Sequence, residues 1–330
     1  MIAAGSLRPA KATRIAQLTL LAGWVGSAGC GGGGGGGGGT AAVSPCADAS
    51  APKLIATASG IPQSIDVRGT TLLAAFTDAA TGDGFILWMD LATRARRTLA
   101  VGRKSPHAVA ASSHFAYWLD SGTLGATEEI STLMRASLDG SGADDPPVPV
   151  TPGSGDTLVA GDTLFFGNNG ALWALAPGAS TPTDLGPEAD PINLASDANY
   201  IYWTSCSSVD RVAKGGGAAE HVADAFCALT LATDGTDVYF KDWSNGLYRV
   251  PATGGTASSV AVSTSIDMSS MVMDDVNVYY GSVGGLYRIG RAGGNPELIA
   301  AGTVTDIAAD DACLYWGDAM QPGVFTIQKM

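Results

Sequence analysis

The side chains best suited to metal or acid–base chemistry are scarce in this chain of 330 residues. Its three histidines, His107, His114 and His221, match no metal-binding spacing, because the ligands of structural zinc sites recur at short, fixed intervals. Residues 139–145 are rich in Asp, but they lack the alternating ligands and the closing Glu of an EF-hand calcium loop. We interpret the histidines as solvated side chains and residues 139–145 as an exposed hairpin loop.

Motifs for phosphate or nucleophilic chemistry are also missing from the sequence. The run Lys214–Gly217 places a Lys beside glycines, but it does not follow the strand-to-helix pattern of a phosphate-binding loop. No Gly-x-Ser-x-Gly sequence marks a hydrolase nucleophile. The sequence therefore assigns no catalytic, metal-binding or cofactor-binding residue, and it favours a protein that is not an enzyme.

The N-terminus predicts export. The first 14 residues carry three positive charges and no negative one, and the largely apolar stretch Ile15–Val25 is too short to span a bilayer. Small residues then precede Cys30, as in the lipobox at which bacteria attach a diacylglycerol to Cys. We expect residues 1–29 to be a lipoprotein signal peptide. Ser27 stands where the lipobox usually has an aliphatic residue, which leaves open an ordinary signal peptide with a free Cys30.

A run of nine glycines, Gly31–Gly39, follows Cys30. Such a run buries no apolar surface and behaves as a flexible coil with a reach of roughly 15–18 Å. We therefore expect residues 30–51 to be a lipidated Cys with a flexible tether, and residues 52–330 to be the folded domain. The protein would then belong to the bacterial envelope, in the outer membrane or at the cell surface, with Cys30 in contact with the lipid bilayer.

The overall charge narrows the range of partners. The chain has 18 Lys and Arg against 31 Asp and Glu, and its net charge is −13. Nucleic acids and anionic membranes select basic surfaces, so the charge disfavours both as binding partners. At 46% hydrophobic residues, the chain can bury a large core.

An internal repeat organises the folded domain. Each copy centres on a pair of mostly aromatic residues, preceded about eight positions earlier by an apolar residue and followed by two further short β-prone stretches. A turn, often with Asp, lies between the first two stretches, and a Gly-containing turn commonly separates the last two. Four short strands per unit of about 40 residues are typical of a propeller blade. The pairs are Leu73-Ala74, Tyr117-Trp118, Phe165-Phe166, Tyr202-Trp203, Tyr239-Phe240, Tyr279-Tyr280 and Tyr315-Trp316.

Seven units predict an all-β, seven-bladed propeller of four-stranded antiparallel blades, with six or eight blades as the alternatives. The seventh unit ends at Met330 after three strands, whereas Lys53–Ala56 resembles the fourth strand Glu297–Ala300. We expect the N-terminal strand to complete the last blade, because joining the two ends in one sheet satisfies edge hydrogen bonds.

Four cysteines remain after Cys30, and an even number in an exported chain suggests two disulfides with three possible connectivities. In a propeller, strand 2–3 loops and links between blades share one face, and the other loops share the opposite face. Cys206 and Cys227 would lie together on the first face, and Cys46 and Cys313 on the second. We therefore predict the disulfides Cys206–Cys227 and Cys46–Cys313.

Two segments, Ile201–Thr204 and Ala116–Asp120, the latter followed by Arg135–Gly140, resemble the YWTD repeats of the low-density lipoprotein receptor family. The resemblance covers most of residues 53–330 as short motifs and implies a propeller, although that family has six blades. The whole chain is also similar to repeat lipoproteins of predatory and soil bacteria. In the YWTD family the Asp of the motif ties neighbouring blades. The matching positions here are Asp120, Asn168, Ser205, Asp242, Ser282 and Asp318.

One aromatic residue falls outside the repeat pattern. Trp243 follows Lys241 and Asp242 in a predicted strand 2–3 loop, where an exposed Trp is a candidate contact residue. We hypothesise a monomeric binding module for a protein, peptide or glycan at the envelope, without a cofactor. The alternative is a metal-centred propeller enzyme, lactonase- or lyase-like and acting outside the cytoplasm, with calcium in its channel.

Overall fold

A computed structural model describes residues 46, 49–121, 132–140, 145–148, 158–168, 170–188, 191–244, 246–262 and 268–329. The predicted signal peptide, Cys30 and most of the predicted tether lie outside the described residues. In the described part, every regular element is a β-strand, so no helix there is long and apolar enough to cross a membrane.

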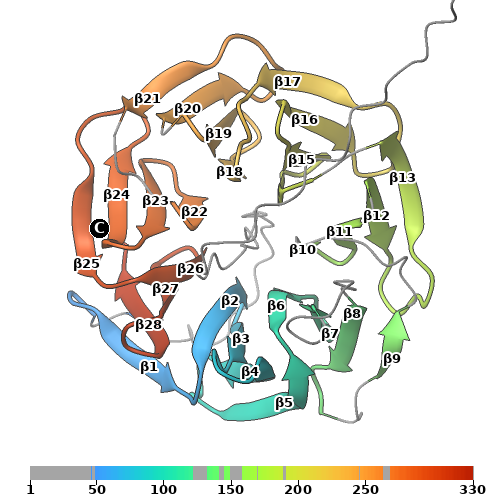
Figure 1. Cartoon of the computed structure of the whole chain (residues 1–330), viewed down its shortest axis with the longest axis vertical. Helices are drawn as coiled ribbons and strands as arrows, with labels where there is room; N and C mark the ends of the chain where they lie inside the picture. Colours follow the sequence, from blue (N-terminus) through green and yellow to red (C-terminus); the bar gives the residue numbers. More distant parts are fainter. Residues whose placement is uncertain are drawn as a thin grey trace, which may run out of the picture.

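Seven four-stranded antiparallel sheets surround a central axis (Figure 1), which confirms the predicted fold and the number of blades. Blade 1 comprises β2 (Ile61–Arg68), β3 (Thr71–Thr77), β4 (Asp83–Asp90) and β5 (Arg96–Lys104). Blade 2 comprises β6 (Pro106–Ala111), β7 (Phe115–Asp120), β8 (Thr132–Ser137) and β9 (Asp145–Val148). Blade 3 comprises β10 (Leu158–Ala160), β11 (Leu164–Asn168), β12 (Ala171–Leu175) and β13 (Thr183–Glu188).

The remaining blades follow in chain order. Blade 4 comprises β14 (Asn193–Ser196), β15 (Tyr200–Thr204), β16 (Ser208–Ala213) and β17 (Glu220–Asp224). Blade 5 comprises β18 (Thr230–Thr233), β19 (Asp237–Lys241), β20 (Gly246–Pro251) and β21 (Ser258–Val262). Blade 6 comprises β22 (Ser270–Met273), β23 (Asn277–Ser282), β24 (Gly285–Gly290) and β25 (Glu297–Ala301). Blade 7 comprises β26 (Val304–Ala309), β27 (Cys313–Asp318), β28 (Gly323–Gln328) and the N-terminal strand β1 (Lys53–Thr57).

The ring closes as the sequence predicts. Strand β1 pairs antiparallel with β28, with Lys53 opposite Thr326 and Thr57 opposite Gly323. Both ends of the folded domain therefore belong to one sheet, and the edge of β28 that the last unit would leave open is covered.

The aromatic pair of each repeat has a clear packing role. Adjacent residues of a strand point to opposite faces of the sheet, so the two aromatic residues enter two different layers between blades. Tyr117 packs toward blade 3, together with Phe166, whereas Trp118 packs toward blade 1, together with Leu73. The pair thus fills the contact with the next blade and the contact with the previous blade, which explains why it recurs in nearly every unit.

Hydrogen bonds between blades come from a position that the sequence did not single out. The residue just before the apolar residue of the first strand accepts a hydrogen bond from the first strand of the next blade. The pairs are Ser64 Oγ with Val109 N, Asn193 Oδ1 with Leu231 N, Ser270 Oγ with Ile307 N, and Asp306 Oδ2 with Ile65 N. These side chains are buried, so each bond stabilises the ring where water is excluded.

The motif positions expected to tie neighbouring blades mostly accept hydrogen bonds within their own turns. Ser282 Oγ accepts from Gly284 N, and Asp318 Oδ1 accepts from Met320 N and Gln321 N, all within their own strand 2–3 turns. Their side chains are short, and the nearest free backbone donors are those of the turn itself. Three of the motif positions also reach a neighbouring segment: Asp120 lies 3.8 Å from Arg103 of blade 1, Asp242 accepts from Phe226 N, and the Asp318 carboxylate packs against Gly302.

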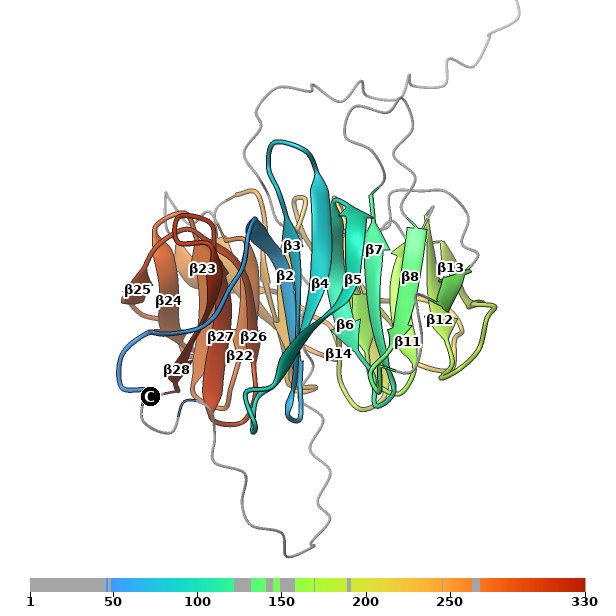
Figure 2. The same cartoon turned by 90° about the horizontal axis from the view of Figure 1, so that it is seen from below.

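The propeller has two faces that differ in the connections they carry. We call the face with the strand 2–3 loops and the links between blades the upper face, and the opposite one the lower face. Figure 2 shows the β3–β4 hairpin at the top and the C-terminus at the bottom. The disulfide Cys46–Cys313 lies at the start of β27, on the lower face, so the chain enters the domain there.

Candidate functional site

The described residues contain no group of three or more His, Cys, Asp or Glu side chains that could hold a metal ion. His221 lies beside Asp210, with Nδ1 3.1 Å from Oδ1, and His107 Nδ1 lies 3.0 Å from Ser121 Oγ. Both imidazoles therefore have polar partners of their own in blades 4 and 2.

Two carboxyl groups of the innermost strands have unusual surroundings. Burial raises the pKa of Asp306 to about 8, although Ile65 N, Ile307 N and Ser270 Oγ all donate to its carboxyl oxygens. Burial likewise raises the pKa of Asp66 to about 6, against the hydrogen bond from Ala111 N. In both cases a carboxyl oxygen accepts a hydrogen bond from a backbone N–H of the next blade, so these groups link neighbouring blades.

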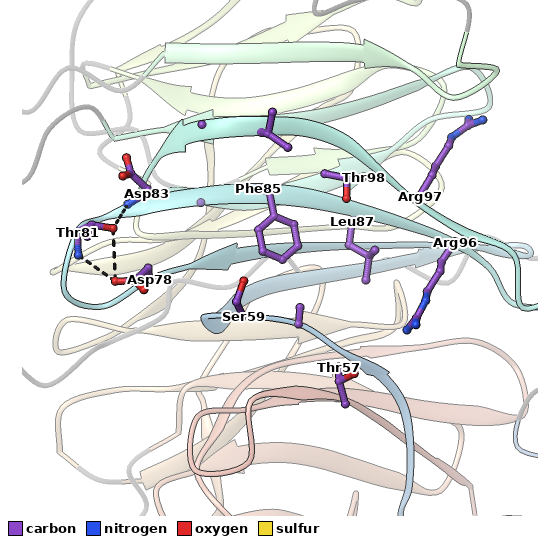
Figure 3. Close-up of a pocket in the computed structure, with 14 residues that line it drawn as sticks. Thr57, Ser59, Asp78, Thr81, Asp83, Phe85, Leu87, Arg96, Arg97 and Thr98 are labelled. Carbon is purple, nitrogen blue, oxygen red and sulfur yellow. Dashed lines mark hydrogen bonds between the residues drawn. The ribbon is translucent and has the colours of Figure 1, made fainter.

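A groove of about 720 Å³ runs along the outer contact between blades 7 and 1. Figure 3 shows Phe85 and Leu87 of β4 pointing toward Thr57 and Ser59 on the opposite wall, with Arg96 at one end. Blade 1 has the longest strands of the propeller, with nine residues in β5, and this overhang forms one wall. The groove is largely open, and its lining mixes apolar side chains with charged ones such as those of Asp78, Asp83 and Arg96.

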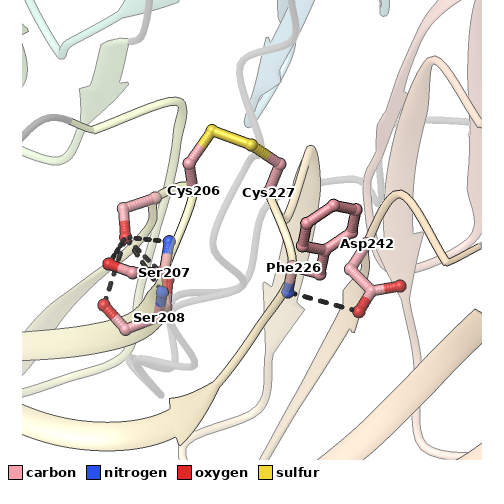
Figure 4. Close-up of a disulfide and its surroundings, with 7 residues drawn as sticks. Cys206, Ser207, Ser208, Phe226, Cys227 and Asp242 are labelled. Carbon is pink, nitrogen blue, oxygen red and sulfur yellow. Dashed lines mark hydrogen bonds between the residues drawn. A yellow bond between two sulfur atoms is a disulfide. The ribbon is translucent and has the colours of Figure 1, made fainter.

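A clasp on the upper face joins blade 4 to the link that leads into blade 5. The disulfide Cys206–Cys227 connects the β15–β16 turn with this link (Figure 4). Around it, Cys227 N donates to Cys206 O, Ala228 N to Ser205 O and Ala225 N to Ser207 O. Cys227 has a φ of 48°, a conformation uncommon for residues other than Gly. The link is therefore held in one shape by covalent and backbone bonds.

Two aromatic side chains project from this clasp into solvent. Phe226 is 64% exposed and Trp243 is 60% exposed. Their backbones are bonded to each other, since Trp243 N donates to Phe226 O over 2.9 Å. Phe226 N in turn donates to Asp242 Oδ2, as Figure 4 shows. The two rings are thus presented from fixed backbone positions next to a disulfide, an arrangement suited to contact with a partner.

The predicted loop of three residues has divided roles. Trp243 is exposed in the β19–β20 loop, where the sequence places it. Lys241 is only 3% exposed and Asp242 only 6%, and Asp242 Oδ1 accepts hydrogen bonds from Ser244 N and Oγ. Asp242 therefore shapes the loop, and Trp243 is the member that can touch a ligand.

Sequence reasoning missed Phe226. It lies in the link between blades 4 and 5, and the links between blades differ in length and sequence, so the repeat pattern gave no reference position for it. Its place directly before Cys227 was the available signal, because a disulfide beside an unpatterned aromatic residue fixes that residue in place.

Further exposed apolar side chains continue from the aromatic pair into the next blades. Val283 lies in the β23–β24 loop and Met320 in the β27–β28 loop, which are equivalent to the β19–β20 loop that contains Trp243. Among the described residues, the upper face thus presents Phe226, Trp243, Val283 and Met320 over blades 5, 6 and 7. We call these four residues the apolar arc.

Comparison with known proteins identifies the fold but no family. No protein-family model and no curated protein matches the chain. The chain is similar to BamB from Moraxella catarrhalis, with 14% identity, a TM-score of 0.56, and 81% of this chain and 82% of the other covered. It is also similar to YCF48 bound to the D1 peptide, with 11% identity, a TM-score of 0.60, and 84% of this chain and 96% of the other covered. A third similar structure is the extracellular domain of the one-component system BT4673 from B. thetaiotaomicron. The identity is 13% and the TM-score 0.63, with 84% of this chain but only 40% of the other covered.

Proposed function

We propose that this protein is an exported binding module, anchored to the bacterial envelope through a lipid on Cys30, that binds a protein or peptide with its upper face. The observation that carries the proposal is the exposed pair Phe226 and Trp243, held by the Cys206–Cys227 clasp. Exposed aromatic residues lose water favourably on binding, and a fixed backbone lowers the entropy that binding costs.

The position of the chain entry supports this use of the upper face. Cys46 is bonded to Cys313 on the lower face, and the tether that we propose for residues 30–51 leads to that side. A lipid on Cys30 would therefore leave the apolar arc facing away from the membrane. Two disulfides are typical of exported proteins, and YCF48, a propeller of the same fold, is known with a peptide bound.

The repeat type is part of the proposal. Buried Tyr-Trp pairs at residues 117–118 and 202–203 support blades of the YWTD type. In three blades the Tyr donates to the Asp of the preceding strand 1–2 turn: Tyr202 to Asp197, Tyr279 to Asp274 and Tyr315 to Asp310. This bond gives both the Tyr and the turn Asp a structural role in each unit, away from the apolar arc.

Site-specific photo-crosslinking in the full-length protein, expressed in its host, tests the function. A photoreactive phenylalanine analogue replaces Trp243, and in a control it replaces Val276, which is 67% exposed on the lower face. We expect a discrete adduct, identifiable by mass spectrometry, from position 243 and none from position 276. No adduct at position 243, or the same adducts at both positions, would contradict the proposal.

A further inference from the structure

We propose that the partner segment bound by the apolar arc is a basic, partly apolar stretch of polypeptide. The inference rests on the proposed function and names the chemistry of the partner. Two independent observations carry it: the apolar arc itself and the distribution of charge between the two faces.

The connections of the upper face contain no positively charged residue in their sequence. These connections are the strand 2–3 loops and the links between blades, and none contains Lys, Arg or His. The turns of the lower face, by contrast, contain basic residues at positions 94, 214, 291 and 329. The two faces therefore differ in whether their connections contain basic residues, and the overall acidity of the chain does not account for this difference.

The basic residues at strand ends near the upper face are already engaged. Lys104 Nζ is bonded to Asp83, and Arg103 lies 3.8 Å from Asp120. Lys241 is buried. In the described part of this face, Lys104 is thus a half-exposed cation, and its charge is balanced by Asp83.

Acidic groups on the same face stay exposed. The side chain of Asp224, two residues before Phe226, is fully exposed, and its Oδ1 lies 3.4 Å from Nε2 of His221. Asp78 is exposed in the β3–β4 hairpin of blade 1, and hydrogen bonds from Thr81 and Ala80 hold its pKa below the usual range. The carboxyl group of Asp78 is therefore negative at neutral pH.

Charge and apolar surface together define the ligand. The face of an indole ring attracts guanidinium and ammonium groups, and an adjacent carboxylate strengthens the attraction at low salt. Val283 and Met320 add aliphatic contact in the two following blades. A segment with Arg or Lys beside apolar residues satisfies both features, whereas an acidic segment would be repelled.

Selection from a displayed library of random peptides tests the partner chemistry. The bait is the full-length protein in detergent, and the selected peptides are then titrated by fluorescence anisotropy. We expect enriched peptides with more Lys and Arg than Asp and Glu. Their affinity should fall at least about tenfold in Trp243→Ser, and by at least about threefold when NaCl rises from about 50 to about 300 mM. Val276→Ser, on the lower face, should bind within about twofold of the wild type.

Asp224→Asn adds a readout for charge alone, since it leaves the aromatic pair in place. It should weaken the selected peptides and reduce their salt dependence. Enrichment of neutral or acidic peptides would overturn the inference, as would enrichment of glycan-mimicking peptides whose affinity does not depend on NaCl. Binding that persists in Trp243→Ser would overturn it as well. A crosslink at position 243 to an acidic partner would refute the basic ligand and leave the binding function intact, whereas no crosslink there removes both.

Discussion

The disulfide Cys46–Cys313 is expected to contribute more to stability than Cys206–Cys227, and the difference follows from chain length. The two bridges span sequence separations of 267 and 21 residues. In the chain-entropy model, closing these loops in the unfolded state is worth about 5–6 and about 3 kcal/mol. Removing the longer bridge should therefore cost about 2 kcal/mol more than removing the shorter one.

The structure adds a local consequence to the global one. Cys46 and Cys313 are both fully buried, and Gln328 N donates to Ala49 O beside them. Without the bridge, the N-terminal strand is held by its pairing with β28, the Gln328–Ala49 hydrogen bond and the packing of Ala49 and Ala56 in the core. Hydrogen exchange of β1 should then become faster than that of the neighbouring strands of blade 7.

Equilibrium urea unfolding, followed by tryptophan fluorescence, measures the difference. The variants are the double substitutions Cys46→Ala with Cys313→Ala and, as the matched control, Cys206→Ala with Cys227→Ala. Each removes one bridge and leaves the other. An equal or larger loss of unfolding free energy in the control pair would refute the argument from loop length and show that local clasp geometry dominates.

Three further outcomes are expected. Burial raises the pKa of Asp306 to about 8, above the value of about 4 for an Asp in the unfolded chain. The contribution of Asp306 to the free energy of unfolding is therefore fully present below pH 4 and is lost as pH rises toward 8. The unfolding free energy of the wild type should thus fall relative to that of Asp306→Asn over this interval, and a pH-independent difference would contradict the assignment. Ser270→Ala removes bonds to Asp306 and from Ile307 and should lower the urea-derived stability by about 1–3 kcal/mol, whereas loss near zero would mean that the ties between blades are dispensable. Gly285→Ala would bring the new Cβ into collision with Ala300 O, whereas a Cβ added at Gly255, also at positive φ, would meet no atom within 4 Å. The thermal midpoint should fall further in Gly285→Ala than in Gly255→Ala, and equal shifts would assign the cost to backbone conformation alone.

Much of the architecture was readable from the repeat. Each aromatic pair serves two neighbouring blades, as Tyr117 and Trp118 show, so it must recur wherever a blade recurs. The strand at Lys53–Ala56 lacked a partner in its own unit, which predicted the closure of blade 7. The same topology placed the four cysteines on two faces and led to the disulfide pairs that the structure contains.

The candidate site was only partly readable from the sequence. Trp243 was recognisable because it broke the repeat, but nothing in the residues showed that Lys241 would be buried or that Asp242 would bond Phe226 N. These relations join segments that belong to different blades. Their distances depend on how the blades turn around the axis, which no local pattern encodes.

By itself, the sequence predicted the all-β class, the seven units, the closing strand and the disulfide pairs, because all of these follow from periodicity and chain order. Only the tertiary structure decided which polar residues fasten the blades and which apolar residues stay exposed. Asp306 bonds Ile65 across the closure of the ring, 241 positions away in the chain, and Phe226 lies beside Trp243 because a clasp of blade 4 holds the link. Burial and hydrogen bonding at these positions are set by neighbours in space, and the folded ring alone brings those neighbours together.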